Sequence, residues 1–176
     1  MRIDAWLPSY DIIDTVQREI HARPNEVYRA LRELDLGRIF WVRALFRLRV
    51  LPSPRNGGFI VLEEKPGEEL VVGAVGRFWR LDNPFEQVTP RGFRAFNRPG
   101  IARLAWNLRV EPRGRRAQVF SQLRVAFPDE AARRPFGVYW ALAGPLSHAI
   151  RWGALESVAR KLEPRRYVRT QRAHVA

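Results

Sequence analysis

The chain has 176 residues, enough for one domain with its own core, and no cysteine, so disulfide bonds and thiolate chemistry are excluded. Its net charge is +13, and almost all of its basic residues are arginines. This charge makes nucleic acid or an anionic membrane surface a candidate partner. The arginines are scattered through every segment, however, and this favours a solvated basic surface. No apolar run reaches the roughly 18 residues that span a bilayer, and the N-terminus lacks the apolar core of a signal peptide, so we expect a cytoplasmic protein.

A half-buried strand is predicted over residues 10–22, where apolar and polar side chains alternate imperfectly. Its apolar face includes Val16 and Ile20. Asp14 and Arg18 lie on that same face, four residues apart, and could orient the polar end of a ligand. The alternative is a salt bridge on an edge strand, which contributes little to stability.

Two short helices should follow this strand. Pro24 suits the first turn of a helix, apolar residues then recur at helical spacing, and Gly37 ends the pattern. Residues 39–46 predict a second short helix. Arginines in and after it would suit a helix that reads DNA, but its apolar bulk favours a cover over a core.

Two hairpins are predicted in the middle of the chain. The first joins residues 59–64 to residues 69–79 through a turn at residues 65–68. Gly73 and Gly76 lie inside the second of these strands, where glycine more often marks a bulge or a bend than a phosphate-binding loop.

The second hairpin joins residues 101–111 to residues 118–127, and its alternation is the cleanest in the chain. Arg124 should point outward. Between the hairpins, residues 81–100 predict a long loop with a short edge strand around Phe93–Phe96. The side chains expected to point inward include Leu104, Trp106, Leu108, Val119 and Leu123.

Residues 129–163 predict one long helix with an apolar stripe. Asp129 is a suitable N-cap for it. Pro135 and Pro145 each remove a backbone donor, and a bend near Pro145 would wrap the helix around whatever it covers.

This order of elements resembles the START-like, or SRPBCC, superfamily, which includes polyketide cyclases and lipid-transport-like proteins. Residues 22–31, ARPNEVYRAL, are similar to the strand-to-helix junction of that family. The resemblance covers about residues 8–163 and implies an α+β helix-grip fold. In this fold a curved antiparallel sheet wraps around a long C-terminal helix, with two short helices after the first strand. We therefore expect a single domain over residues 1–176, with a frayed tail at 164–176.

The resemblance also implies a cavity between the sheet and the last helix. The function it suggests is binding or transport of an apolar or amphipathic small molecule, lipid-like or polyketide-like. Large aromatic side chains with few inward polar groups suit such a pocket, although aromatics at these positions are more often ordinary core. The candidate lining residues are Phe78, Leu104, Trp106, Leu123, Tyr139, Trp140, Ala143 and Ile150.

Two other functions stay open at this stage. An enzyme of the cyclase or dehydrase type, acting without a cofactor, would need an acid–base pair, for which Asp14 with Arg18 or Tyr139 is the best candidate. A basic module could instead bind RNA non-specifically or touch an anionic membrane surface peripherally. The three histidines are far apart, so no metal site is expected, and His148 falls off the apolar stripe, as a surface or rim residue would. The oligomeric state stays open.

Overall fold

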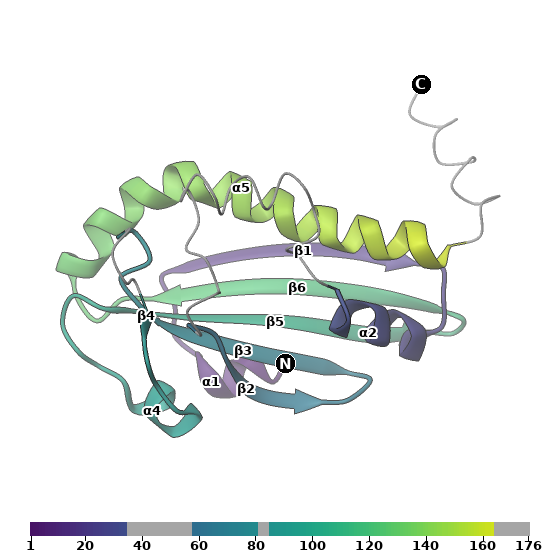
Figure 1. Cartoon of the computed structure of the whole chain (residues 1–176), viewed down its shortest axis with the longest axis horizontal. Coiled ribbons are helices and arrows are strands. Elements are labelled where there is room, and N and C mark those ends of the chain that lie inside the picture. The colour runs from purple at the N-terminus through teal and green to yellow at the C-terminus, as the bar shows by residue number, and fades with distance from the viewer. Residues whose placement is uncertain (35–57, 81–84, 164–176) are drawn as a thin grey trace.

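The computed structural model describes residues 1–34, 58–80 and 85–163, which form one antiparallel sheet with helices on both faces (Figure 1). The strands occur in the spatial order β1-β6-β5-β3-β2, and β4 pairs with β3. The strands are β1 (Ile12–Ile20), β2 (Ile60–Lys65), β3 (Glu69–Gly76), β4 (Phe85–Glu86), β5 (Ala102–Arg113) and β6 (Arg116–Ala126). The helices are α1 (Ile3–Trp6), α2 (Pro24–Arg32), α4 (Pro90–Ala95) and α5 (Glu130–Leu162).

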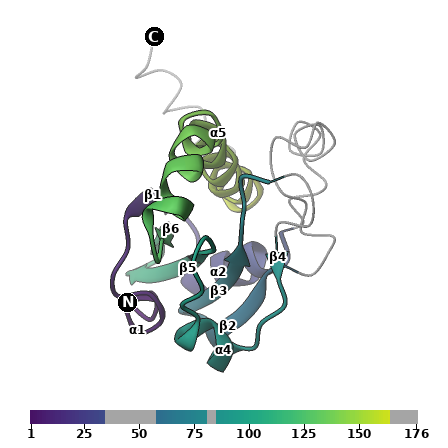
Figure 2. The ribbon, with the colours of Figure 1, turned by 90° about the vertical axis from the view of Figure 1, so that its left-hand side faces the viewer.

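This arrangement confirms the predicted α+β helix-grip fold, because a curved antiparallel sheet cradles one long C-terminal helix (Figures 1 and 2). The first predicted short helix is α2, with Pro24 in its first turn. The second, at residues 39–46, lies outside the described residues.

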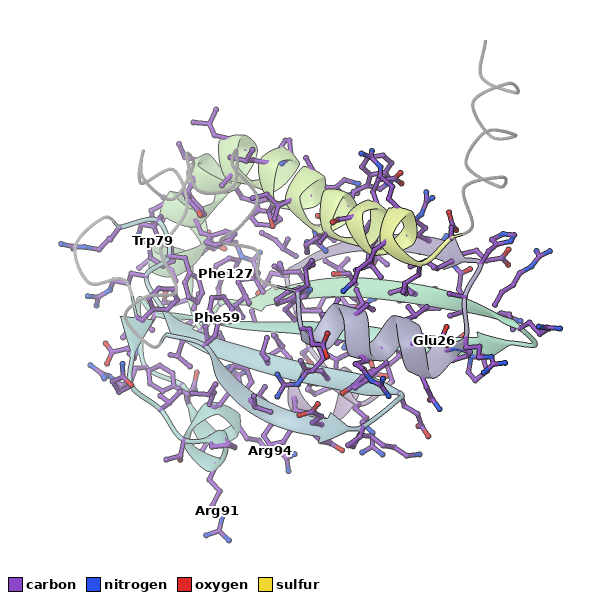
Figure 3. The ribbon with its side chains drawn as sticks, turned by 45° about the vertical axis from the view of Figure 1, so that its right-hand side comes forward. Glu26, Phe59, Trp79, Arg91, Arg94 and Phe127 are labelled. Carbon is purple, nitrogen blue, oxygen red and sulfur yellow. The ribbon has the colours of Figure 1, made fainter. Side chains whose placement is uncertain are left out.

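Helices α5 and α2 lie on one face of the sheet, which we call the inner face, and two apolar clusters pack there. One cluster joins α2 and the C-terminal half of α5 to the sheet through residues such as Val27, Val119 and Leu155. The other cluster, here called the aromatic cluster, surrounds Phe136. Its rings include Trp79 and Phe127, whose centroids lie 6.0 and 5.0 Å from that of Phe136, near the start of α5 (Figure 3).

The opposite, outer face of the sheet is covered by α1 and α4, neither of which was predicted as a helix (Figure 2). The expectation of an edge strand around Phe93–Phe96 was wrong. Thr89 accepts a hydrogen bond from the backbone N–H of Gly92 at 3.1 Å and Pro90 occupies the first turn, so a helix begins there. Phe93 is fully buried, whereas Arg91 projects from α4 into solvent (Figure 3).

Gly73 has a packing role, and it is not itself a bulged residue. It pairs regularly with both neighbouring strands, and the register shift between β2 and β3 lies elsewhere, at Val61/Glu63. A Cβ at Gly73 would lie 2.7 Å from Leu62 and 2.9 Å from the Phe93 ring. The glycine therefore allows α4 to approach the sheet closely.

Arg124 faces away from α5, as predicted, yet it is only 3% exposed because α1 covers it. Its guanidinium donates to the backbone oxygen of Leu7 at 3.0 Å and to the carboxylate of Asp4 at 2.7 Å. Arg124 therefore fastens the N-terminal segment to the outer face.

Helix α5 confirms the expected N-cap, since Asp129 accepts a hydrogen bond from the backbone N–H of Ala132 at 2.9 Å. The helix continues through Pro135 and Pro145 and curves over the sheet (Figure 1). Both prolines are exposed, as are the residues four positions earlier, whose carbonyls lose a helical partner. Water can bind those carbonyls, so the helix bends without ending.

Candidate functional site

A partly enclosed pocket of about 170 Å³ lies on the inner face, between the two apolar clusters. Strand register builds its floor, because Leu108 pairs with Leu70 on one side and with Ser121 on the other. Helices α2 and α5 supply the walls. The lining residues are Leu31, Arg32, Leu34, Leu70, Trp106, Leu108, Ser121, Arg151 and Ala154.

The pocket is mainly apolar and has room for a ring-sized group, since a cavity of about 150 Å³ can hold benzene. Trp106 is its largest side chain. The indole N–H of Trp106 donates to Oγ of Ser121 at 2.8 Å, which fixes the orientation of the ring. The tryptophan can therefore shape the pocket without leaving its N–H unpaired.

Arg151 is the buried polar group of the pocket wall, with 5% of its surface exposed. Its guanidinium forms an ion pair with the carboxylate of Asp14 and donates to the backbone oxygens of Asp14 and Ser121 at 3.1 Å each. Burial lowers the pKa of Arg151, and the Asp14 carboxylate opposes this shift. Its buried Nε has no hydrogen-bond partner among the described residues, so one donor beside the pocket is unsatisfied.

Asp14 also binds His148, whose Nδ1 lies 2.9 Å from Oδ1 of the carboxylate. The His148 side chain is 49% exposed, as expected for a surface or rim residue. One carboxylate of β1 thus holds two residues of α5. Neither Asp14 nor His148 lines the pocket.

Asp14 and Arg18 share the inner face, as the alternation predicts, but each pairs with α5 rather than with the other. Nη1 of Arg18 lies 2.8 Å from the Glu156 carboxylate, and Nη2 lies 3.7 Å from that of Glu163. Ion pairs of both Asp14 and Arg18 therefore hold α5 along the edge strand β1.

Of the eight candidate cavity residues, Trp106 lines the pocket and the other seven do not. The others pack beside it on the inner face: Phe78, Leu104 and Leu123 lie in the aromatic cluster with Tyr139 and Trp140, and Ala143 and Ile150 are buried on α5.

Tyr139, one of the weak catalytic candidates, packs with its ring centroid 5.6 Å from that of Phe136. Burial raises the pKa of Tyr139 to about 12, so its phenol keeps its proton at neutral pH.

Sequence reasoning missed Arg151. The signal was available, because Arg151 lies four residues after Ser147 and three before Ala154, within the apolar stripe of the last helix. A charge at such a position indicates a buried ion pair.

A second hollow, of about 330 Å³, lies where β1 leads into α2. Its lining is largely charged and suits an apolar ligand less well. The residues that line this second hollow are His21, Ala22, Arg23, Glu26, Arg115, Arg116 and Leu162.

Within the described ranges, no cluster of His, Asp and Glu could hold a metal ion, and no helix is long and apolar enough to cross a membrane.

Comparison with models of protein families found no match, and comparison with curated proteins found none. Among solved structures, the chain is similar to a protein of Mesorhizobium loti, with 16% identity, 87% of this chain and 100% of the other covered, and a TM-score of 0.45. A conserved protein of Geobacillus kaustophilus is 12% identical, with 86% of this chain and 98% of the other covered and a TM-score of 0.40. The Zhui aromatase/cyclase of a Streptomyces species is 14% identical, with 85% and 95% covered and a TM-score of 0.34. Likeness at this level carries no information about ligand or activity.

Proposed function

We propose that the chain belongs to the START-like superfamily and binds or transports an apolar or amphipathic small molecule, lipid-like or polyketide-like, of which a ring-sized part occupies the pocket between the sheet and α5. The observation that carries this proposal is the pocket itself, with leucines from α2, β3 and β5 around Trp106 and one buried arginine in its wall. Apolar walls with a few placed polar groups are typical of small-molecule sites.

Binding has more support than catalysis. A cyclase or dehydrase would need an acid–base pair beside the ligand. Asp14 is engaged by Arg151 and His148, and it lies outside the lining of the pocket. Tyr139, with its raised pKa, would be a poor base at neutral pH.

The test is a pair of titrations, with a fatty acid and with an aromatic polyketide, against the wild type and Trp106→Ala. Truncation should enlarge the pocket and change the two affinities by different factors, because the opened volume suits one shape better. It should also lower the free energy of unfolding, by less than the roughly 3–5 kcal/mol of a fully buried tryptophan, because Trp106 is only partly buried.

Tyr10→Ala is the control, because Tyr10 is an exposed aromatic residue that lies outside both the pocket and α5. It should leave both affinities unchanged. If neither ligand binds the folded wild type at concentrations near a millimolar, the proposal fails.

A further inference from the structure

The side of α5 that faces away from the sheet is apolar over much of its length. Val138, Leu142 and Trp152 are 75%, 78% and 48% exposed, and Ala141, Pro145 and Ala149 are exposed beside them. We call these six residues the outer stripe. Between residues 135 and 152, none of the exposed side chains is an aspartate, glutamate, lysine or arginine.

The opposite side of the same stretch is also apolar, since Phe136, Ala143 and Ile150 are buried against the sheet. A helix that is apolar all round is normally buried all round. Here the sheet covers α5 from one side only (Figure 2). Residues 135–152 would extend about 27 Å as a helix, and an exposed apolar surface of that length indicates an interaction site.

The charges around the outer stripe indicate which partner fits it. Arg133 and Arg134 precede it and Arg160 and Lys161 follow it, all of them exposed. Most of these side chains have acidic neighbours: Arg133 and Arg134 lie 3.5 and 3.6 Å from the Glu130 carboxylate, Arg133 also pairs with Asp11, and Arg160 lies 3.0 Å from the Glu156 carboxylate. The positive charge that attracts an anionic partner therefore belongs to the chain as a whole, which carries +13. An exposed apolar helix face on a protein with a net charge of +13 matches the surface of an anionic bilayer. A second copy of the chain would instead bring two strongly positive molecules together.

We propose that the outer stripe docks α5 in the plane of an anionic lipid surface. Val138, Leu142 and Trp152 enter the boundary between headgroups and acyl chains, and exposed basic side chains such as Arg134 and Lys161 contact lipid phosphates. This interaction is peripheral, and it is independent of whether the pocket holds a ligand.

The test is flotation of the full chain with vesicles of neutral phosphatidylcholine and with vesicles containing phosphatidylglycerol. The wild type should bind the anionic vesicles and bind the neutral ones far more weakly. Val138→Glu with Leu142→Glu should weaken binding at least about tenfold, because two exposed apolar side chains no longer enter the lipid. Both positions are exposed, so circular dichroism should show an unchanged fold.

Val61→Glu is the matched control, because Val61 is an exposed apolar residue on β2, outside the outer stripe. It adds one negative charge, and Val61→Glu with Ile13→Glu, at an exposed apolar position of β1, adds two. These variants should lose much less affinity than the stripe variant. Equal loss in the stripe and control variants would assign binding to net charge alone and overturn the proposal. It would also be overturned if the wild type ignored anionic vesicles, or if it formed a dimer that the stripe variant abolished.

Discussion

Asp14 and Arg151 form the ion pair that holds α5 to β1 beside the pocket, and the cost of breaking it can be predicted. Asp14→Ala leaves the Arg151 charge buried without its counterion, which should lower the free energy of unfolding by about 3–5 kcal/mol. The measurement is urea unfolding followed by circular dichroism.

Glu19→Ala is the control on the same strand, because Glu19 pairs with the exposed Arg116. That substitution should cost less than about 1 kcal/mol, the usual contribution of a surface pair. Equal losses in the two variants would show that the Asp14–Arg151 pair is not buried.

For single residues, strand alternation predicts that Asp14 points inward, but it does not predict which residue Asp14 pairs with. Arg151 and His148 lie more than a hundred residues away in the chain, and the pairing depends on how α5 is rotated against β1. The alternation of side chains along β1 carries no information about how α5 is rotated. Trp106 was predicted to line a pocket because its own strand shows which face it occupies.

Among the elements, α5 contains three glycines, and two of them, Gly137 and Gly144, have contrasting surroundings. At Gly137 an added Cβ would have nothing within 4 Å, whereas at Gly144 it would lie 2.9 Å from the Trp140 indole. Gly137→Ala should raise the free energy of unfolding by about 0.5–1 kcal/mol through helix propensity. Gly144→Ala should lower it, because overpacking costs about 1–3 kcal/mol and exceeds that gain. Thermal or urea unfolding of both variants checks this, and stabilisation by Gly144→Ala would contradict the packing of Trp140.

The contact between α2 and β2 should depend on pH. Arg32 donates to the Glu64 carboxylate at 3.0 Å and the Tyr28 hydroxyl donates to it at 2.8 Å, and these hydrogen bonds lower the pKa of Glu64. A carboxyl whose pKa is lower in the folded state stabilises the fold above its unfolded pKa and loses this contribution as pH falls through the folded pKa.

The stability advantage of the wild type over Glu64→Gln should therefore shrink from about pH 5 to about pH 3. The measurement is the urea midpoint across that range, with Glu33→Gln as the control, since no ion pair of Glu33 occurs among the described residues. An advantage that does not change with pH would contradict the contact.

The elements that the sequence predicts well are those with a clear period or a capping residue. Strands β5 and β6 alternate, and Asp129 is the N-cap of α5, as expected. Helices α1 and α4 were not predicted, because four and six residues are too few to show a helical period. Phenylalanine is common in strands, which favoured a strand around Phe93, but the N-cap Thr89 and the following Pro90 start a helix there.

For the molecule as a whole, ion pairs with arginine occur along the chain, from Arg2–Glu63 to Arg160–Glu156. This dispersion supports a solvated basic surface. Binding to RNA should therefore be weak, independent of sequence, and steeply reduced by salt. Fluorescence anisotropy with two unrelated RNAs at several salt concentrations checks this, and selective binding that survives physiological salt would contradict it.

The helix-grip fold was implied by the resemblance of the element order to the START-like superfamily, and the structure shows that order of strands and helices. The position of the pocket could not be predicted in the same way. It depends on where α2 and α5 leave a gap between two apolar clusters, which is a property of packing across the sheet.

The most direct test of the proposed function is an NMR titration of the full chain with ethylbenzene, a ring-sized apolar molecule. We predict saturable chemical-shift changes at Leu31, Leu70 and Leu108 and at the indole N–H of Trp106, all of which belong to the pocket lining. Residues of the outer face such as Phe93 should not change. No change at the pocket up to the solubility limit of ethylbenzene, or changes confined to the outer face, would contradict the account.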